Sequence, residues 1–321
     1  MHQVSSAQIV LAILLAFVIA SPARACCMVG NRFFPATLNV DDPCVTDELA
    51  LPGITGFKNG DQPSAQELDI SGDYEKTITE NFGFSIAEDW IHLNIPRDGS
   101  HSGFDDLATG FKYQFVRDAK GELDMSVSLD VDWGETGSST VGAAPFTTLT
   151  PTVFAGKGFG FLPEIMKFFK PFAVTAQVGY SIPTEFSTTV VDQHGGLVTT
   201  APNPQFLVWG GSLQYSMPYL KSSVQDLNLP AFVNQLFPLV EAKLSTPVAN
   251  FSLGESTTGT INPGIIYVTK KYQFGVEAIL PINRASGDGV GVIGQFDLYL
   301  DDIFPKSVGR PLFAPQQPAG Q

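Results

Sequence analysis

Two shortages limit the class of protein that this sequence can encode. Beyond the first 25 residues, no apolar run in the 321-residue chain reaches the roughly 20 residues that a membrane-spanning helix needs, so we do not expect a helical membrane protein. Basic residues are also few, with 18 Lys and Arg against 32 Asp and Glu and a formal net charge of −14. Because contacts to phosphate need many basic side chains, nucleic acid is not an expected partner.

Histidine and catalytic motifs are scarce as well. The four histidines are His2, His92, His101 and His194. The chain lacks the Gly-x-Ser-x-Gly motif of serine hydrolases, and the glycine-rich run at 156–160 lacks the Ser or Thr that follows Lys in a phosphate-binding loop. Acid pairs such as Asp130 and Asp132 are more simply explained as solvated residues on a polar face than as calcium ligands. We therefore expect no catalytic residue, no cofactor and no metal site.

The start of the chain has the pattern of a signal peptide. A short polar segment from Met1 to Ser6 precedes an apolar run from Ile9 to Ala20, and Ala23-Arg24-Ala25 supplies the small residues that a signal peptidase recognises. We expect cleavage after Ala25, which removes Arg24 and no acid and so leaves a net charge of −15. Such an acidic exterior or lumen would favour cations.

The three cysteines, Cys26, Cys27 and Cys44, all lie at the start of the exported part. Export to an oxidising compartment favours one disulfide, from Cys26 or from Cys27 to Cys44, with one thiol left over. Lipid attachment at Cys26 is an alternative, although Ala23 stands where a lipid-attachment motif usually has Leu. A zinc site is not expected, since three cysteines without a neighbouring histidine do not complete the usual ligand set.

The clearest structural pattern is a strict alternation from Leu123 to Trp133. The odd positions are all apolar, whereas the even positions hold Asp124, Ser126, Ser128, Asp130 and Asp132. A period of two indicates a strand with one apolar and one polar face. Similar segments are expected at 68–78, 82–95, 104–116, 122–133, 146–161, 171–181, 204–217, 238–247, 258–268, 272–282 and 289–300.

These strands are longer than the 5 or 6 residues common in soluble proteins and match the roughly 9 to 11 residues that cross a bilayer at a tilt. The connections alternate between tight turns and longer polar loops, as in outer-membrane barrels. The expected fold is all-β: an antiparallel transmembrane β-barrel of about 12 strands with short helical periplasmic turns, at Leu162–Phe169 and near Leu229–Phe232. Since bacterial barrels have even strand numbers, a twelfth strand should lie within residues 46–66 or arise from a split segment.

Four regions follow from this interpretation. Residues 1–25 are the signal peptide, and residues 26–66 are an N-terminal periplasmic or plug-like segment that carries the cysteines. Residues 67–305 form the barrel, and residues 306–321 form a disordered Pro-rich tail. The polar residues that alternate with apolar ones are predicted to face the lumen and to set its selectivity: Lys112, Gln114, Asp124, Ser126, Ser128, Asp130, Gln177, Gln214, Glu277 and Gln295.

Several runs resemble outer-membrane transporters related to the meta-pathway phenol-degradation barrel proteins. The resemblance covers roughly residues 65–305. It rests on Gly275–Asn283, Val290–Gln295, Leu298–Pro305, Leu162-Pro163-Glu164, Lys170–Val174, Val178–Pro183 and Pro238–Glu241. It implies a barrel in the outer membrane of a Gram-negative cell and a role in moving small hydrophobic or aromatic molecules, with no catalytic residues. In contrast to many such barrels, the chain continues past Phe304 through a Pro-rich segment.

The predicted function is therefore an outer-membrane pore or transporter for small solutes, with membrane lipid and the solute as partners and the oligomeric state left open. Two alternatives remain at this point. One is a soluble periplasmic β-sandwich that binds a ligand, and the other is a non-conducting structural barrel at the cell surface. Whether the barrel is open or plugged depends on the width of its lumen, since open channels are common only near 16 strands.

Overall fold

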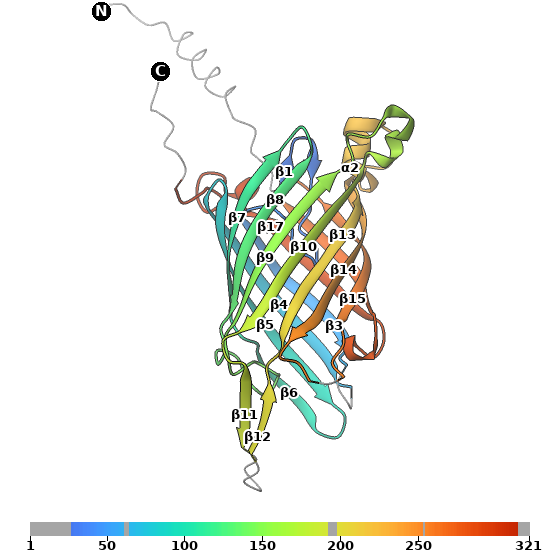
Figure 1. The fold of residues 1–321 in the computed structure, drawn as a ribbon. Helices are drawn as coiled ribbons and strands as arrows, with labels where there is room; N and C mark the ends of the chain where they lie inside the picture. The colour runs from blue at the N-terminus through green and yellow to red at the C-terminus, as the bar shows by residue number, and fades with distance from the viewer. Residues whose placement is uncertain (1–26, 61–63, 192–197, 253, 314–321) are drawn as a thin grey trace, which may run out of the picture.

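The protein is a closed antiparallel barrel in a computed structural model that describes residues 27–60, 64–191, 198–252 and 254–313. The predicted signal peptide and Cys26 lie outside these described residues. Twelve strands form the barrel, and it closes where β17 pairs with β3 (Figure 1). They are β3 (Glu48–Lys58), β4 (Gln66–Thr79), β5 (Phe82–Ile95), β7 (Ala108–Asp118), β8 (Leu123–Asp132), β9 (Thr148–Gly158), β10 (Phe172–Pro183), β13 (Gln205–Tyr215), β14 (Leu236–Ala249), β15 (Thr258–Val268), β16 (Tyr272–Pro281) and β17 (Gly291–Tyr299).

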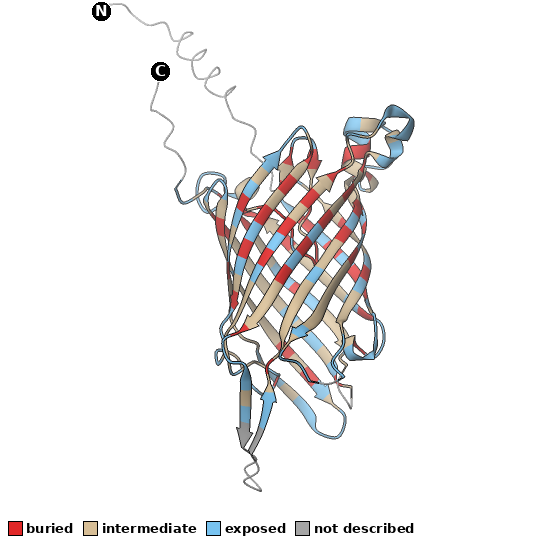
Figure 2. Ribbon diagram, viewed as in Figure 1, coloured by how far each residue is buried: buried red, intermediate tan, exposed pale blue. Residues whose placement is uncertain are grey.

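The alternation in the sequence becomes an inside and an outside of the barrel. On β16, Gln273 and Glu277 are buried, whereas Phe274 and Val276, which lie between them in the sequence, are exposed. Figure 2 shows the same alternation of buried and exposed residues along the other strands. Successive side chains of a strand point to opposite faces, so the polar set faces inward and the apolar set outward. This arrangement is the reverse of a soluble barrel with an apolar core.

The prediction of a barrel of about twelve antiparallel strands is confirmed, and the eleven expected segments all contain a barrel strand. The twelfth is β3, which lies within residues 46–66. The barrel therefore begins at Glu48, and the expected boundary between residues 66 and 67 is wrong. Pro52, Gly53 and Gly56 interrupt the alternation of this strand, and its pairing with β4 shifts register between Ala50 and Gly53.

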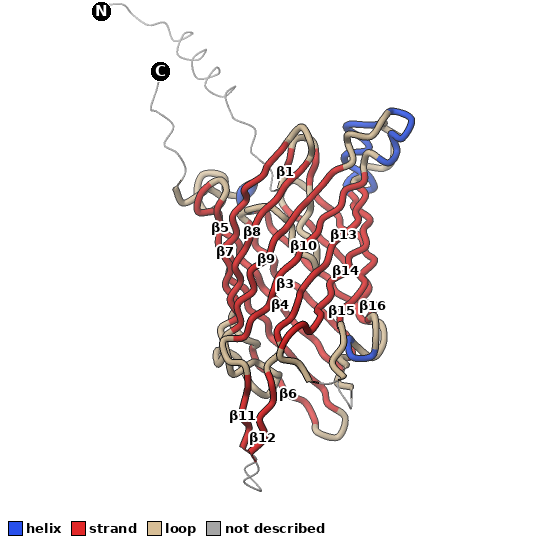
Figure 3. The backbone as a smooth tube through the Cα atoms, viewed as in Figure 1, coloured by secondary structure: helices blue, strands red, loops and turns tan. Residues whose placement is uncertain are grey.

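The two ends of the barrel differ in their connections (Figure 3). At the end that we call the plug end lie tight turns, such as the one between β7 and β8, and the short helices η1, α2, η2 and η3. At the opposite loop end, the β6 and β11–β12 hairpins project beyond the barrel (Figure 1). The remaining elements are β1 (Met28–Val29), β2 (Arg32–Phe33), β6 (Gly99–Phe104), η1 (Glu164–Phe169), β11 (Ser187–Val191), β12 (Val198–Pro202), α2 (Met217–Tyr219), η2 (Leu220–Val224), η3 (Val233–Gln235), η4 (Arg284–Ser286) and α3 (Leu300–Ile303).

The described helices are all short. None of them is both long and apolar enough to cross a membrane. The predicted helical turn at Leu162–Phe169 is present as η1, but the helices between β13 and β14 flank Leu229–Phe232 rather than occupy it.

The segment after α3 is ordered where the structure describes it, which corrects the prediction of a wholly disordered tail from residue 306. The backbone N–H groups of Leu312 and Phe313 donate hydrogen bonds of 3.2 and 2.9 Å to the carbonyl oxygens of Thr77 and Ile78. The pairing of β3 with β4 stops at Glu75, so on that side the later carbonyl groups of β4 are left for the tail to pair with. Residues 314–321 lie outside the described residues.

Candidate functional site

Residues 27–47, which we call the plug segment, lie inside the plug end of the barrel. Much of the segment is buried, including Val29, Phe34 and Val40, each 0% exposed. A disulfide between Cys27 and Cys44 joins its two ends, with 5.4 Å between their Cα atoms. Of the two pairings that the sequence left open, this is the one in the structure. The segment thus forms a closed loop that folds back within the lumen before the chain enters β3.

An ion pair holds the base of the plug segment. Arg32 is fully buried, and its Nη2 lies 3.0 Å from Oε2 of Glu122 on the β7–β8 turn. Its guanidinium also donates to the carbonyl oxygens of Lys170 and Pro171, at 2.6 and 2.9 Å, and lies 3.8 Å from the ring centre of Tyr219. Tyr219 in turn donates a 2.7 Å hydrogen bond to Glu122 Oε1. These five groups therefore bind one another, and they hold the base of the plug segment in one defined position.

Burial shifts the pKa values of the groups at this base. It lowers the pKa of Arg32, and the neighbouring Glu122 carboxylate partly offsets the effect. Burial, followed by the hydrogen bond to Glu122, raises the pKa of Tyr219 to about 12. The phenol of Tyr219 therefore stays protonated and continues to donate its hydrogen bond throughout the physiological range.

Apolar contacts hold the middle of the plug segment against the barrel wall. Phe34 belongs to a buried cluster with Cys27, Cys44 and Ala173, and Leu38 belongs to a second cluster. The second cluster consists of Leu38, Phe237, Leu239 and Ile266. These apolar residues point inward near the plug end. The period-two pattern predicts a polar lumen and therefore does not predict them.

Wall glycines make room for the plug segment. A Cβ at Gly275 would lie 2.4 Å from Leu38 Cδ1, and one at Gly156 would lie 2.9 Å from Pro43 Cγ. Glycine within a strand commonly marks a place where another segment approaches closely. The glycines of these strands therefore leave space that the plug segment fills.

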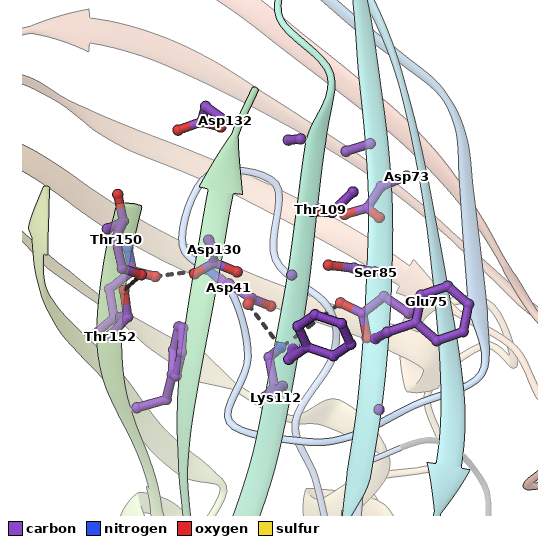
Figure 4. A pocket seen from close by; sticks show the side chains of 18 of the residues that line it. Asp41, Asp73, Glu75, Ser85, Thr109, Lys112, Asp130, Asp132, Thr150 and Thr152 are labelled. Carbon is purple, nitrogen blue, oxygen red and sulfur yellow. Dashed lines mark hydrogen bonds and ion pairs between the residues drawn. The ribbon is translucent and has the colours of Figure 1, made fainter. Parts of the chain in front are cut away.

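The tip of the plug segment, Asn39–Asp42, reaches the middle of the barrel. The backbone N–H groups of Asn39 and Val40 donate to the two carboxylate oxygens of Glu241, both at 3.0 Å. Lys112 Nζ lies 2.7 Å from Asp41 Oδ2 and 3.8 Å from Glu75 Oε1, the ion pairs marked by dashed lines in Figure 4. The tip is thus held by polar groups on opposite walls.

Burial also affects Asp42, the last residue of the tip. It raises the pKa of Asp42 well above its usual value, and the neighbouring Lys112 charge opposes this shift. The Oδ1 atom of Asp42 accepts a 2.6 Å hydrogen bond from the backbone N–H of Cys44. The plug segment therefore contains an acid whose ionised form is disfavoured when the segment is seated.

The predicted lumen residues alternate with outward apolar residues, and most of them are buried. The buried ones are Gln114, Asp124, Ser126, Ser128, Gln177, Gln214 and Glu277, whereas Lys112, Asp130 and Gln295 are partly buried. Gln177 accepts from the backbone N–H of Asp41 at 3.0 Å, and Gln114 donates to Asp124 at 2.6 Å. Several therefore contact the plug segment or each other instead of lining an open path.

A cavity of 510 Å³ lies on the loop-end side of the plug tip (Figure 4). Its wall includes five acids against two lysines: Asp41, Asp73, Glu75, Asp130, Asp132, Lys112 and Lys243. A second cavity, of 350 Å³, adjoins the first at Asp41, Asp73 and Glu75 and extends toward Asp89 and Asp297. The space left beside the plug segment is therefore acidic, and Lys243 contributes to both cavities.

Sequence reasoning missed several of these groups. Asp73 and Glu75 belong to the weakly alternating β4, and Glu241 was part of a run noted only for its resemblance. Tyr219 and Tyr299 were not identified either, and they are internal, at 8% and 2% exposed. The signal that could have identified Asp73 and Glu75 is their spacing of two residues around Tyr74, which places both on one face of the strand.

Cys27, Cys44 and Asp124 bring their ligand atoms within 4.8 Å of one another. In the structure the two sulfurs are bonded to each other. A metal ion would need both as free thiolates, so the oxidised chain does not offer this ligand set.

No protein-family model and no curated protein matches the chain. Among solved structures, it is similar to an outer-membrane channel from Pseudomonas putida F1, with 10% identity, a TM-score of 0.46, and coverage of 83% of this chain and 99% of the other. It is also similar to the NanC porin (8%, TM-score 0.45, 78% and 98%) and to LpxR from Salmonella typhimurium (11%, TM-score 0.40, 78% and 99%). Likenesses at this level carry no conclusion about function.

Proposed function

We propose that this chain is a bacterial outer-membrane channel for small solutes, whose lumen is restricted by the plug segment. The observation that carries the proposal is the outer surface, because each of the twelve barrel strands exposes at least one large apolar side chain. Phe111, Val178 and Val292, on three separate parts of the circumference, are 50–52% exposed. Continuous apolar surface on this scale is unfavourable in water and favourable against lipid.

The connections give the orientation in the membrane. Outer-membrane barrels have short periplasmic turns and longer external loops, so we place the plug end in the periplasm and the β11–β12 hairpin outside. The connection between β13 and β14 is long for a periplasmic turn, yet it carries exposed apolar residues such as Phe232, which is 60% exposed. Together with Ile165 of η1, which is 93% exposed, these residues are suited to lie at the periplasmic surface of the outer membrane, where lipid meets water.

The charge of the cavities suggests the class of solute. Carboxylates outnumber lysines on both cavity walls, and a low-dielectric wall strengthens their field. This favours small cations or neutral polar molecules over the hydrophobic or aromatic molecules that the family resemblance implies. Passage needs either the space beside the plug tip or a displacement of the plug segment.

The experiment is a conductance measurement on the purified full chain in planar bilayers, with and without reduction of the Cys27–Cys44 disulfide. We expect channels whose reversal potential in a KCl gradient indicates cation selectivity. Asp73→Asn should lower that selectivity, because Asp73 lies on both cavities. Asp226→Asn, an exposed acid between η2 and η3, is the matched control and should leave it unchanged.

The tightness of the plug favours one second candidate, a non-conducting structural barrel. A buried ion pair, apolar clusters and a disulfide hold the plug segment together. Absence of conductance in both redox states, for protein that fractionates with the outer membrane, would support this candidate. Recovery of the chain from the soluble periplasm without detergent would contradict both and favour a soluble ligand-binding protein.

A further inference from the structure

Three polar residues on adjacent strands meet in the wall behind the plug tip. Glu241 lies on β14, Asn262 on β15 and Glu277 on β16, and these strands pair in that order. Their exposed fractions are 0%, 2% and 1%. Gly264 leaves space for the Glu277 side chain, since a Cβ there would lie 2.3 Å from Glu277 Cγ.

Three oxygen atoms of this group have no hydrogen-bond donor in the structure. Both carboxylate oxygens of Glu277 and the Oδ1 of Asn262 are buried without a donor. Glu241 accepts the two N–H groups of the plug tip, at Asn39 and Val40, and lies within hydrogen-bond reach of Glu277. Buried oxygens without donors are rare in folded proteins and call for an unobserved partner.

The charge of the group is also uncompensated. Within the described residues, neither Glu241 nor Glu277 forms an ion pair with a lysine or arginine. The Asn262 amide can donate one N–H to Glu277, but a second carboxylate oxygen and the repulsion between the two acids remain. Two adjacent buried carboxylates need either a bound cation or a shared proton.

We propose that Glu241, Asn262 and Glu277 bind one hard divalent cation of the calcium class. Carboxylate and amide oxygens are the ligands that this ion prefers, and its flexible coordination tolerates an irregular set. Zinc would favour nitrogen or sulfur ligands, and magnesium would demand near-octahedral geometry. Since Glu241 also binds the plug tip, the ion would link the plug segment to the wall. This inference concerns a site apart from the acidic cavities and does not require conduction.

Direct binding to the full chain in detergent tests the site without any conductance measurement. After treatment with a chelator, isothermal titration calorimetry with calcium should show one binding site, from which magnesium displaces calcium only poorly. Calcium should also raise the unfolding temperature of the protein. Glu277→Gln should weaken binding by about tenfold or more, because it removes a charged ligand. Asn262→Leu provides a second variant that removes a neutral ligand and leaves both acids.

Glu164→Gln is the matched control, since Glu164 is an exposed acid on η1 paired with Lys170. It should bind calcium like the unaltered chain. If the unaltered chain binds no calcium, or if all variants bind equally, the site is not a cation site. Infrared detection of a protonated carboxyl that is lost in Glu277→Gln and is insensitive to calcium would show instead that the two acids share a proton, and would overturn the proposal.

Discussion

Arg32 of the plug segment and Glu122 of the β7–β8 turn form an ion pair in which the arginine side chain is 0% exposed and the glutamate side chain is 10% exposed. Glu122 adopts a left-handed backbone conformation with φ of 48°, which is uncommon for a non-glycine residue. The turn thus holds an unusual conformation that directs this carboxylate into the barrel. The pair connects the start of the plug segment to the wall 90 residues later in the chain.

Arg32→Met should weaken the seat of the plug segment strongly. Removing one partner of a buried ion pair leaves an uncompensated charge and typically costs about 3–5 kcal/mol. We expect a lower free energy of unfolding in detergent and larger single-channel conductance. Tyr219→Phe is the milder companion, because it removes only one hydrogen bond and should cost about 1 kcal/mol. Equal effects of the two variants would contradict the central role of the ion pair.

The disulfide should control how firmly the plug segment stays closed. Cys27 and Cys44 are separated by 17 residues, and cross-links that close loops of this size contribute about 3 kcal/mol. The double variant Cys27→Ser, Cys44→Ser should therefore conduct more than the oxidised chain, and a reducing agent should produce the same increase in the unaltered chain. A conductance that does not respond to reductant would show that the plug segment is retained by its other contacts alone.

The barrel could be predicted from the sequence because its signal is local. From Leu123 to Trp133 the alternation alone separates inward Asp124 and Ser126 from outward Val127 and Leu129. The same reasoning failed for β3, where Pro52 and two glycines interrupt the pattern. It also failed after residue 306, where composition suggested disorder but Leu312 and Phe313 pair with the end of β4.

The site could be predicted only in part, because it depends on contacts between residues far apart in the chain. The alternation of polar and apolar residues identified Lys112 and Gln177 as inward-facing. No feature of the sequence near either residue predicts that Asp41 binds both. Asn39 and Glu241 are 202 residues apart. A short-range pattern contains no information on such pairs, so the sequence left open whether the lumen is filled.

The seated plug segment should be favoured at low pH because of Asp42. Its pKa is raised in the folded chain by burial, by Asp41 and by Glu75, while Lys112 acts in the opposite direction. A raised carboxyl pKa contributes stability that is fully present below the unfolded value of about 4 and is lost as the pH rises through the folded value. Conductance should therefore increase as the pH is raised from about 4. Asp42→Asn should flatten this dependence, whereas Asp226→Asn should retain it. An unchanged pH profile in Asp42→Asn would assign the effect to other acids.

The fit between Gly275 and Leu38 gives a steric test of the plug. Gly275 faces the lumen on β16, and any Cβ there would overlap Leu38, whose cluster includes the fully buried Ile266. Gly275→Val should therefore displace the plug segment and increase conductance, at a cost of about 1–3 kcal/mol for overpacking. Gly294, on the adjacent β17, is the matched control, because a Cβ there would have only one neighbour, at 3.7 Å. Gly294→Val should leave conductance unchanged. If both variants behaved alike, the effect would come from the loss of strand glycines, and Leu38 would not be a point where the plug segment is held.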